Sequence, residues 1–545
     1  VPGGHVSLRL SPVPGLPVAA QRPYYVGNKT VYLIGKNGEQ PNDSMDYRGM
    51  KIHYYKKMQV RPNMLYRWLN YQAYVKNDSL RKLQRSRLYS QYRQQRVQEK
   101  LAQLGIFRYM DIQYTPRDTT AACDTLDVNL QATFDKPLDA ELELNVTNDQ
   151  TGPGASFSVT RNNVFGGGET WNVKLKGAYE WQTGGGKGSS LLNSWEMGAS
   201  TSLMFPRVVF PRFGGREYDF PASTTFKLYA DQMNRAKYYK LLSFGGNATY
   251  DFQPTPTSRH SLTPFRLTFN VLQHRTAAFE EVAEKNKALL LSLQDQFVPA
   301  MEYTYTYDNS SVRSVRNPVW WQTTFTSAGN ITSGIYRIFG QPFSEKNKKL
   351  LGAPFAQFLK LNTDYRYLWK LDRNNAIAAR IAGGVLWTYG NSTVAPYNEQ
   401  FYVGGANSIR AFTVRSIGPG GYHPEKSEFS YLDQTGDIRL EANIEYRFRI
   451  YKDLHGAVFL DAGNVWLMRY DPERPDAQLR LKTFPKQVAL GTGAGLRYDL
   501  DFLIFRFDCG VPLHDPYDTG KSGYYNVRGA FWKQLGLHFA IGYPF

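Results

Sequence analysis

After Pro137 the chain alternates apolar and polar residues in runs of roughly 10–13 residues. Alternation with a period of two predicts β-strands that have one apolar face. A tilted strand needs about 9–11 residues to cross a bilayer, whereas the strands of soluble proteins average about 5–6 residues. The pattern therefore favours a transmembrane β-barrel over a soluble β-sandwich, which also alternates. The clearest runs are 170–181, 361–371, 437–450 and 537–545.

The composition agrees with a barrel. The 545 residues include 38 Tyr, 32 Phe and 47 Gly, and disordered chains are poor in aromatic residues. No apolar stretch reaches the roughly 18 residues that a membrane-spanning helix needs. Trp and Tyr near the ends of the apolar rows are typical of the aromatic girdles of outer-membrane barrels. One strand for each alternating run from Leu138 to Phe545 gives about sixteen antiparallel strands, an even number that suits a single-chain barrel.

The residues before the barrel follow a different pattern. Residues 1–45 are rich in Pro and Gly, and we predict that they form a linker or the edge of a truncated upstream domain. Residues 46–136 show the order strand, helix, helix, strand, strand, which predicts a small α+β domain. The barrel is then expected to occupy residues 137–545. Within the small domain we predict helices at 62–69 and 88–104 and the last two strands at 106–114 and 125–134.

No complete motif for catalysis or cofactor binding is present. In the glycine-rich segment 184–190, Gly188 stands where a phosphate-binding loop has Ser or Thr. The glycines of 491–495 lie in an alternating strand and not at a strand-to-helix turn, which excludes a dinucleotide site. Cys123 and Cys509 have no Cys or His nearby at the spacing of metal ligands. We expect no enzymatic activity, no cofactor and no metal.

The formal net charge is +18. No basic helix or base-stacking motif accompanies this charge, so we expect no nucleic-acid partner. A basic lumen or attraction to anionic outer-membrane lipids explains the charge equally well.

Four segments carry motifs that match one family in order. Segment 395–412 contains Gly404 and Gly405 followed by the tetrad Ile409-Arg410-Ala411-Phe412, and segment 457–466 contains an Asp-x-Gly motif at Asp461 and Gly463. Together with 104–114 and 162–171, they resemble the lid loop, an inner strand, the periplasmic POTRA module and the second turn of the BamA/TamA superfamily of outer-membrane assembly proteins. Ala411 departs from the family, which more often has Gly at that position.

The resemblance covers about residues 46–545 and implies a POTRA domain in the periplasm and a barrel in the outer membrane of a Gram-negative bacterium. One visible POTRA-like domain makes the chain most similar to a TamA- or TamL-like branch. The implied function is the assembly and insertion of β-barrel proteins, with unfolded outer-membrane proteins as clients and outer-membrane lipids as surroundings. An assembly partner in the periplasm or the inner membrane is a further expectation. Strand parity places the lid loop, about residues 391–436, between the eleventh and twelfth strands.

In the family the lid arginine docks on the Asp-x-Gly strand, and this role is carried over to Arg410. Strand parity points Asp461, Glu441 and Glu445 into the lumen, so that we expect Arg410 to lie among these carboxylates and Gly463. The planar guanidinium can bind a carboxylate with two hydrogen bonds. The alternative is that Arg410 is one of many solvated basic residues of the lumen.

The first and last strands are expected to meet at a seam. Leu142 and Leu144 mark the short first strand, 138–146, and Phe539, Tyr543 and Phe545 mark the apolar row of the last strand. A short edge leaves backbone N–H and C=O groups that can template a client strand by β-augmentation. The third POTRA strand, 125–134, or the second helix is expected to offer clients an edge or a groove.

Two other functions remain open at this stage. Related two-partner secretion transporters export polypeptides through the lumen, but they carry an N-terminal plug helix, of which residues 1–45 show no pattern. A passive, porin-like channel would need neither a POTRA-like domain nor a lid signature.

Overall fold

In the computed structural model the chain forms two compact units. The first contains the chain up to Asp139 together with residues 161–170 and 210–221, and the second contains the remainder. No helix in the described part of the chain is long and apolar enough to span a membrane. The described residues are 22–70, 88–120, 122–146, 153–180, 194–210, 221–235, 239–277, 279–280, 287–312, 315–343, 345–346, 348–423, 434–500, 503–527 and 534–545.

The N-terminal unit is built on a five-stranded sheet with the order β2-β3-β1-β5-β4. Strand β1 runs parallel to β3 and β5, and the pairs β2–β3 and β4–β5 are antiparallel. The elements are β1 (Tyr25–Ile34), β2 (Asp43–Tyr47), β3 (Met50–Tyr54), α1 (Pro62–Leu69), α3 (Gln91–Ala102), β4 (Phe107–Pro116) and β5 (Thr125–Phe134).

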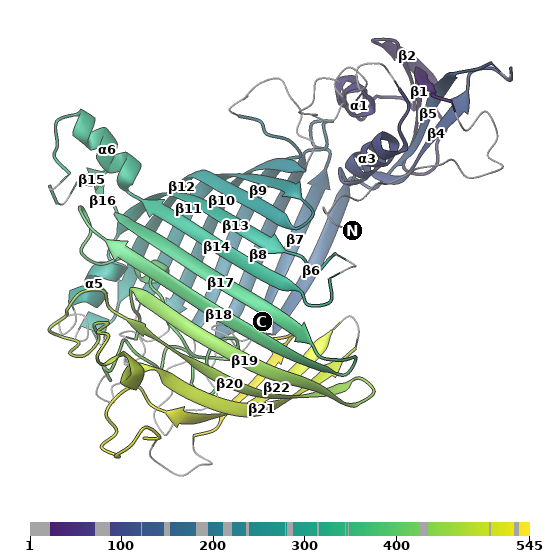
Figure 1. Cartoon of the computed structure of the whole chain (residues 1–545). Coiled ribbons are helices and arrows are strands. Elements are labelled where there is room, and N and C mark those ends of the chain that lie inside the picture. The colour runs from purple at the N-terminus through teal and green to yellow at the C-terminus, as the bar shows by residue number, and fades with distance from the viewer. Residues whose placement is uncertain are drawn as a thin grey trace, which may run out of the picture. The chain divides into compact units, whose positions relative to one another are not determined.

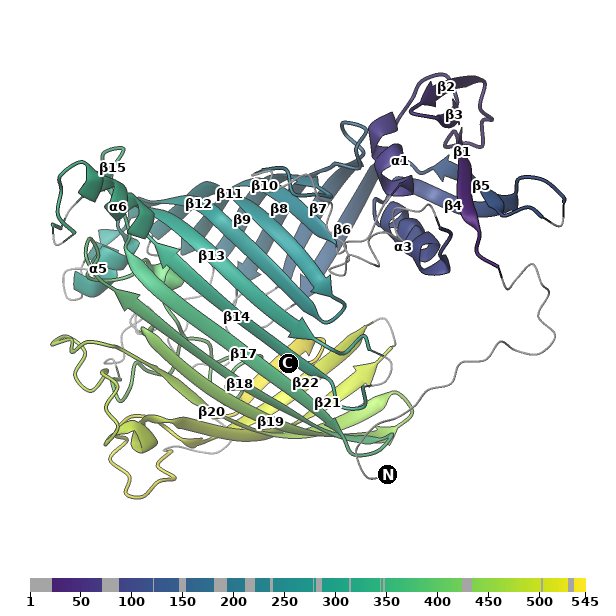
Figure 2. The ribbon, with the colours of Figure 1, turned by 45° about the horizontal axis from the view of Figure 1, so that its top comes forward.

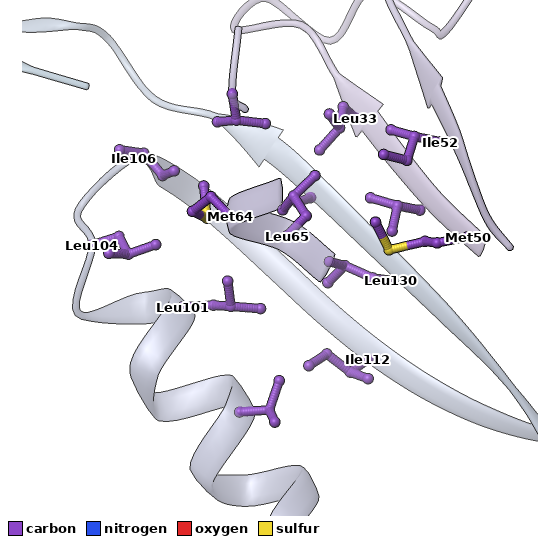
Figure 3. Close-up of a cluster of buried hydrophobic side chains, with 14 of the residues drawn as sticks. Leu33, Met50, Ile52, Met64, Leu65, Leu101, Leu104, Ile106, Ile112 and Leu130 are labelled. Atoms are coloured by element: carbon purple, nitrogen blue, oxygen red, sulfur yellow. The ribbon is translucent and has the colours of Figure 1, made fainter. Parts of the chain in front are cut away.

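The two helices and the sheet enclose one apolar core (Figure 3). Helix α1 begins with Pro62, a residue that suits the first turn because its missing N–H has no partner there. Its Leu65 and the Leu101 of α3 are fully buried against strand residues such as Ile52 and Leu130. The apolar stripe of each helix therefore fixes it on the sheet.

Two sequence expectations for this unit are wrong. The domain begins before residue 46, because β1 lies inside the predicted linker and its Val31 and Leu33 are buried in the core. A register shift between Val26 and Lys29 interrupts the alternation of β1, which hides the strand in the sequence. Strand β5 offers no edge to a client, because it lies between β1 and β4; the edges of this sheet are β2 and β4.

The second unit is the expected antiparallel barrel of sixteen strands (Figures 1 and 2). Successive strands are neighbours, and β6 and β23 stand at the two ends of the strand order. The strands are β6 (Leu138–Val146), β7 (Pro153–Asn162), β8 (Thr170–Glu180), β9 (Ser194–Phe205), β10 (Ala222–Arg235), β11 (Tyr239–Thr255), β12 (Ser258–Arg275), β13 (Gln296–Asp308), β14 (Val319–Ala328), β17 (Phe358–Lys370), β18 (Asn375–Thr388), β19 (Ile438–Tyr451), β20 (Leu454–Trp466), β21 (Ala489–Asp499), β22 (Ile504–His514) and β23 (Gly536–Ile541).

Alternation along each strand separates an outer apolar face from a polar lumen. On β19, Leu440 and Ile444 are exposed on the outer face, whereas Glu441 and Glu445 are buried inside. The long loop from residue 389 to 437 connects β18 and β19, the eleventh and twelfth barrel strands. The shorter elements in the connections are α5 (Lys287–Leu293), α6 (Asn330–Ile338), β15 (Lys349–Leu350), β16 (Ala353–Pro354), η2 (Tyr397–Glu399) and η3 (Phe484–Gln487).

The last strand is shorter than the sequence pattern predicts. Strand β23 pairs with β22 only from Gly536 to Ile541, and Gly542 then adopts a φ of +84°, a backbone conformation that favours glycine. Tyr543 and Phe545 therefore lie beyond the strand and do not belong to its apolar row. Phe539 does lie on β23, where its ring packs against that of Phe507.

The first barrel strand has the predicted bounds. Leu142 of β6 is exposed, as a membrane-facing residue of the outer surface would be. The side chain of Leu144 lies outside the described residues.

Candidate functional site: the lid loop inside the barrel

The lid loop, residues 389–437, makes a tight turn before it reaches Arg410. Gly404 and Gly405 have φ values of +100° and +95°, and a Cβ at Gly404 would lie 2.2 Å from the carbonyl oxygen of Thr413. The backbone N–H of Gly405 donates to the carbonyl of Phe412 (2.9 Å). Both glycines are needed for this conformation. Ala411 does not adopt a positive φ, so that its methyl group fits where the family more often has Gly.

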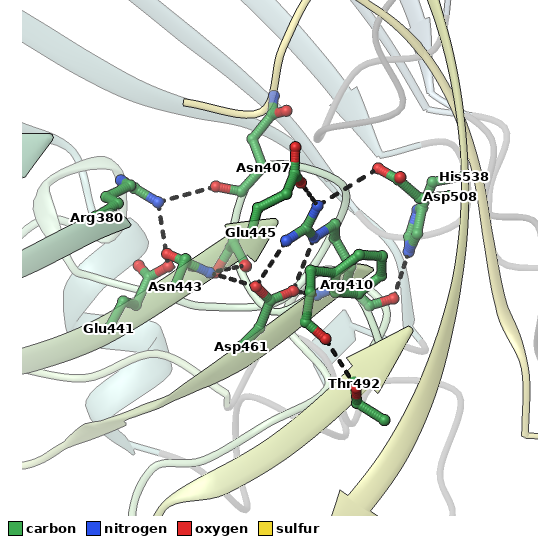
Figure 4. Close-up of polar contacts among 12 residues, drawn as sticks. Arg380, Asn407, Arg410, Glu441, Asn443, Glu445, Asp461, Thr492, Asp508 and His538 are labelled. Atoms are coloured by element: carbon green, nitrogen blue, oxygen red, sulfur yellow. Dashed lines mark hydrogen bonds and ion pairs between the residues drawn. The ribbon is translucent and has the colours of Figure 1, made fainter. Parts of the chain in front are cut away.

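Arg410 is buried and bound to Asp461 by three hydrogen bonds (Figure 4). Its Nε and Nη2 donate to Oδ2 and Oδ1 of the carboxylate at 2.8 and 2.9 Å, and its backbone N–H donates to Oδ2 at 3.1 Å. Burial acts to lower the pKa of Arg410, but the hydrogen bonds and negative charge of Asp461 outweigh it and raise the pKa above its ordinary value. The lid loop thus places a positively charged guanidinium in the lumen, where the hydrogen bonds to Asp461 hold it in position.

The Arg410 side chain also contacts groups on three further sides. Its Nη1 donates to Glu445 of β19 and lies 3.8 Å from Oδ2 of Asp508 on β22. The guanidinium carbon lies 3.5 Å from the centre of the Phe459 ring, a cation–π contact. One loop residue therefore binds side chains of β19, β20 and β22.

Three arginines of the barrel wall complete the charge network. Arg497 donates to Asp508 (2.6 Å) and to Glu445 (3.1 Å), and Arg447 donates to the other oxygen of Glu445 (2.8 Å). Nε of Arg506 lies 3.6 Å from Asp508. Four arginines thus share three buried carboxylates, those of Asp461, Glu445 and Asp508, so that each of these carboxylates has a cationic partner.

The structure brings together only part of the set expected around Arg410. Glu441 accepts a hydrogen bond from Ser408 of the lid (2.6 Å) and lies 3.6 Å from Arg380, and it does not bind Arg410. Gly463 lies on β20 opposite Glu441, where a Cβ would come within 2.5 Å of the carbonyl oxygen of Leu440. The close approach of β19 therefore explains why position 463 is a glycine.

Three further glycines make room for the lid. A Cβ at Gly491 of β21 would lie 2.3 Å from the Cβ of Ala411. A Cβ at Gly510 of β22 or Gly536 of β23 would lie 2.4 or 2.6 Å from the carbonyl oxygen of Arg410. The backbone of the loop therefore packs directly on the wall of the last three strands.

The lid also contacts the last strand and the chain end. Nε2 of His538, on β23, donates to the carbonyl oxygen of Arg410 (2.7 Å), so that this nitrogen carries a proton (Figure 4). Nη2 of Arg447 donates to the backbone oxygen of Phe545 (3.2 Å), and its guanidinium lies 4.2 Å from the ring centre of Tyr543. The network around Arg410 therefore holds both β23 and the residues after it.

A second anchor holds the other side of the loop. Glu399, in η2, accepts hydrogen bonds from Arg266 of β12 and Lys360 of β17, each at 3.0 Å. Burial acts to raise the pKa of Glu399, but the charges of Lys360 and Arg266 outweigh it and hold the pKa below its ordinary value. The loop is thus tied to β12 and β17 at Glu399 and to β19, β20, β22 and β23 near Arg410.

Apolar packing supports the loop between these anchors. Ile409 and Val403 are fully buried in a cluster with Leu386, Val465 and Val298 of the barrel wall. Phe412 packs against the same cluster. The tetrad therefore combines one charged contact with two apolar anchors.

Strand parity pointed to Asp461 and Glu445, but several contacts of the site have no signal in the sequence. Asp508, Arg497 and Arg506 stand two residues or more apart on β21 and β22, and only the register of these strands brings them together. Glu399 and His538 each make one contact across more than 100 residues of chain. In the described part of the chain no group of three His, Cys, Asp or Glu residues is arranged to hold a metal.

Comparisons with known proteins give one consistent result. The model of the Omp85 superfamily domain matches residues 163–545. The outer membrane protein assembly factor BamA of Nitratidesulfovibrio vulgaris is 28% identical over 185 residues, which are 33% of this chain and 20% of that protein. The match thus spans about a fifth of the length of this curated relative.

Two solved structures were compared with the chain, and the first shows the same fold. BamA from Haemophilus ducreyi lacking POTRA domains 1–3 superposes with a TM-score of 0.61 at 13% identity, over 95% of this chain and 85% of that one. CdiB from Acinetobacter baumannii has a TM-score of 0.46 at 12% identity, over 90% of this chain and 75% of that one. The first of these supports a sixteen-stranded barrel preceded by a POTRA-like α/β domain.

Proposed function

Because the chain belongs to the Omp85 superfamily of outer-membrane β-barrel proteins, we propose that it assembles and inserts other β-barrel proteins into the outer membrane. Clients would be templated at the seam between β6 and β23. The N-terminal POTRA-like domain, residues 25–134 in the described structure, would lie in the periplasm and receive unfolded clients. The barrel would begin at residue 137, and membership of a TamA- or TamL-like branch remains our prediction.

The observation that carries this proposal is the short last strand. β23 pairs with β22 over six residues, Gly536–Ile541, whereas β19 and β18 are fourteen residues long. A strand of six residues offers few backbone groups for pairing with β6 across the seam, which lowers the free energy of opening the seam. An edge that separates easily exposes the N–H and C=O groups that an incoming client strand can pair with.

The lid loop would brace this seam from inside. The Arg410 carbonyl accepts from His538 of β23, and Arg447 of the same network binds the backbone of Phe545. Lid, last strand and chain end are therefore one hydrogen-bonded assembly. Such a brace would hold β23 in register while a client pairs with the opposite side of the seam.

Polypeptide export through the lumen is the alternative function. The lid loop lies inside the barrel and is tied at Glu399 and at Arg410 to different parts of the wall. A polypeptide that passes through the lumen would have to displace this loop, together with the buried ion pairs that hold it. This requirement favours assembly at the seam over export.

The test is client folding in proteoliposomes. An unfolded barrel protein is added to vesicles that contain the wild type, Arg410→Ala, or no protein, and folding is followed by heat-modifiable gel mobility. Arg259→Ala is the matched control, because Arg259 pairs with Asp251 on the same barrel but is 64% exposed and far from the lid in sequence. We expect the wild type and Arg259→Ala to accelerate folding and Arg410→Ala to lose most of the acceleration.

Two results would contradict the proposal. Equal folding rates in empty and protein-containing vesicles, with several clients, would exclude an insertase. An added polypeptide that enters the vesicles and becomes protected from external protease, without barrel folding, would support export instead.

A further inference from the structure

Helix α6, in the connection between β14 and β17, is attached to the barrel rim by its polar side. Oγ of the buried Ser333 donates to Gln357 (3.0 Å), Nε2 of Gln357 donates to Asn330 (3.1 Å), and the Tyr389 hydroxyl also donates to Asn330 (2.6 Å). Gly329 precedes the helix with a φ of +70°, and a Cβ there would lie 2.3 Å from the carbonyl oxygen of Ala356. These contacts fix how the helix is rotated about its axis.

The opposite side of α6 and its C-terminal end are apolar and exposed. Ile331, Ile335, Ile338 and Phe339 follow the spacing i, i+4, i+7 and i+8, which puts them on one face of a helix. Their exposed fractions are 60%, 48%, 83% and 81%. In a water-soluble protein a helix buries this face and exposes its polar face. In α6 the polar side is attached to the barrel and the apolar face is exposed. We therefore expect the apolar face to contact a neighbour other than water.

The position of α6 in the barrel indicates what that neighbour is. Ala328, the last residue of β14, pairs with Phe358, which pairs with Thr388, and the adjacent Trp387 is exposed on the outer face. Outward Trp residues near strand ends mark the boundary between acyl chains and headgroups. Helix α6 thus begins at the level of this boundary, and it extends beyond the end of β14 at the outer edge of the barrel rim (Figures 1 and 2).

The membrane-facing surface continues from β14 into the helix. Trp321 and Phe325 of β14 are exposed on the outer face of the barrel, and Ile331 follows them as the second residue of α6. The apolar surface next to the helix is extended by Leu351, at the tip of the β15–β16 hairpin, which is 85% exposed. The apolar face of α6 is therefore continuous in sequence with the lipid-facing surface.

Basic residues lie on the other side of the helix and in the residues that follow it. Arg337, Lys346 and Lys349 are exposed, against one exposed carboxylate, that of Glu345, among the described residues of the connection. An apolar helix face with basic side chains on the opposite side is the pattern of helices that lie in the interface of a membrane with anionic headgroups.

We propose that α6 lies in the interface of the outer leaflet of the membrane. Its apolar face would lie among the acyl chains, and Arg337, Lys346 and Lys349 would lie at the anionic headgroups. The choice of leaflet rests on the proposed function, which places the domain before β6 in the periplasm. Helix α6 lies at the barrel rim opposite to the start of β6, and that rim would face the outside of the cell. The inference itself needs only the barrel fold, and it holds whether the protein assembles clients or exports polypeptides. Its consequence is a lipid anchor on one side of the barrel rim.

The experiment measures the contact of α6 with lipid in the full chain. Single cysteines are introduced as Ile338→Cys, Arg337→Cys, Phe325→Cys and Leu481→Cys in a background with Cys123→Ser and Cys509→Ser, since both native cysteines are free. Each variant is labelled with bimane and reconstituted into phosphatidylcholine vesicles with or without doxyl-labelled lipid. Heat-modifiable mobility establishes that each variant is folded.

We expect doxyl lipid to quench the label at Ile338 as strongly as at the lipid-facing Phe325, and about twofold more than at Arg337 on the other side of the helix. Leu481 is the matched control, because it is 90% exposed in the loop between β20 and β21 but does not belong to an apolar helix face. Its label should be quenched by aqueous iodide and not by doxyl lipid.

A second comparison tests the role of charge. Replacing half of the phosphatidylcholine by phosphatidylglycerol should increase the quenching at Ile338, and the triple variant Arg337→Gln, Lys346→Gln, Lys349→Gln should lose this increase. Equal quenching at Ile338 in both vesicle types would remove the basic residues from the proposal. Quenching at Ile338 by iodide but not by doxyl lipid would overturn the proposal as a whole and would favour a protein as the partner of this face.

Discussion

Nε2 of His538 donates a hydrogen bond to the carbonyl oxygen of Arg410 across 2.7 Å, and this bond joins the last barrel strand to the central residue of the lid. The two residues are separated by 128 positions of the chain. Because β23 has only six residues paired with β22, a single additional bond is a considerable part of what holds it.

We predict that His538→Phe loosens β23 without unfolding the barrel. The loss of one buried hydrogen bond costs about 0.5–1.5 kcal/mol, which corresponds to an increase of up to about tenfold in the exchange rate of the β23 amides. Hydrogen exchange with mass spectrometry on Gly536–Ile541 measures this. His260→Phe is the matched control. His260 of β12 makes one hydrogen bond of 2.7 Å to Tyr303 of the adjacent β13, and both strands are far from β23 in the strand order. Equal exchange in both variants would show that the lid does not stabilise β23.

Arg410→Ala should destabilise the barrel far more than the removal of an exposed arginine. It leaves Asp461 and Glu445 buried with fewer partners, which costs about 3–5 kcal/mol. Arg259→Ala, at an exposed ion pair, should cost about 0–1 kcal/mol. Unfolding in guanidinium chloride, followed by tryptophan fluorescence in detergent micelles, compares the two. Asp461→Asn on top of Arg410→Ala should then recover part of the loss, because the uncompensated charge disappears.

Gly510→Ala should displace the lid from the barrel wall. The new methyl group would lie 2.4 Å from the carbonyl oxygen of Arg410, and that atom belongs to a backbone that is held on several sides. We expect faster proteolysis within residues 389–437 and reduced client folding. Gly177→Ala, on β8, adds the same methyl group where no atom lies within 4 Å, and it should leave both measurements unchanged. An intact lid in Gly510→Ala would contradict the packing described for β22.

The anchor at Glu399 should be resistant to moderate acid. The pKa of Glu399 is lowered from 4.5, because the charges of Lys360 and Arg266 outweigh its burial. A carboxylate of this kind stabilises the folded state above its unfolded pKa and loses that contribution as the pH falls through the lower, folded value. Proteolysis of the lid loop should therefore stay slow down to about pH 4.5 and increase at lower pH. Glu399→Gln should show faster proteolysis already at neutral pH and a weaker dependence on acid.

The barrel could be predicted from the sequence because its strands alternate without interruption. The run from Asp437 to Ile450 corresponds to β19 within one residue at each end, and strand counting placed the lid between the correct strands. In the N-terminal domain the same reasoning failed for β1, where Gly27, Asn28 and the register shift after Val26 break the alternation. Periodicity locates a strand only where the ladder is regular.

The site could be predicted only where one strand carries the pattern. Asp461 and Glu445 were located by parity on β20 and β19, but the pairing of Arg497 with Asp508 depends on the register between β21 and β22. The end of β23 was missed because Tyr543 and Phe545 continue the alternation, whereas Gly542 turns the backbone out of the strand. Local conformation at a glycine is set by its neighbours in space and leaves no periodic signal.

The two anchors of the lid divide the barrel wall into sectors of different stiffness. The hydrogen bonds and ion pairs at Glu399 reach β12 and β17, and those at Arg410 reach β19, β20 and β23. The loop acts there as an internal strut, because bending this sector would stretch buried charge contacts. Tyr397 of the loop adds an apolar contact with Tyr239 and Leu241 of β11. Neither of the two anchors binds a strand from β6 to β10, so that these strands can bend at the cost of sheet curvature alone. Widening of the barrel at its seam would then be taken up by its N-terminal strands.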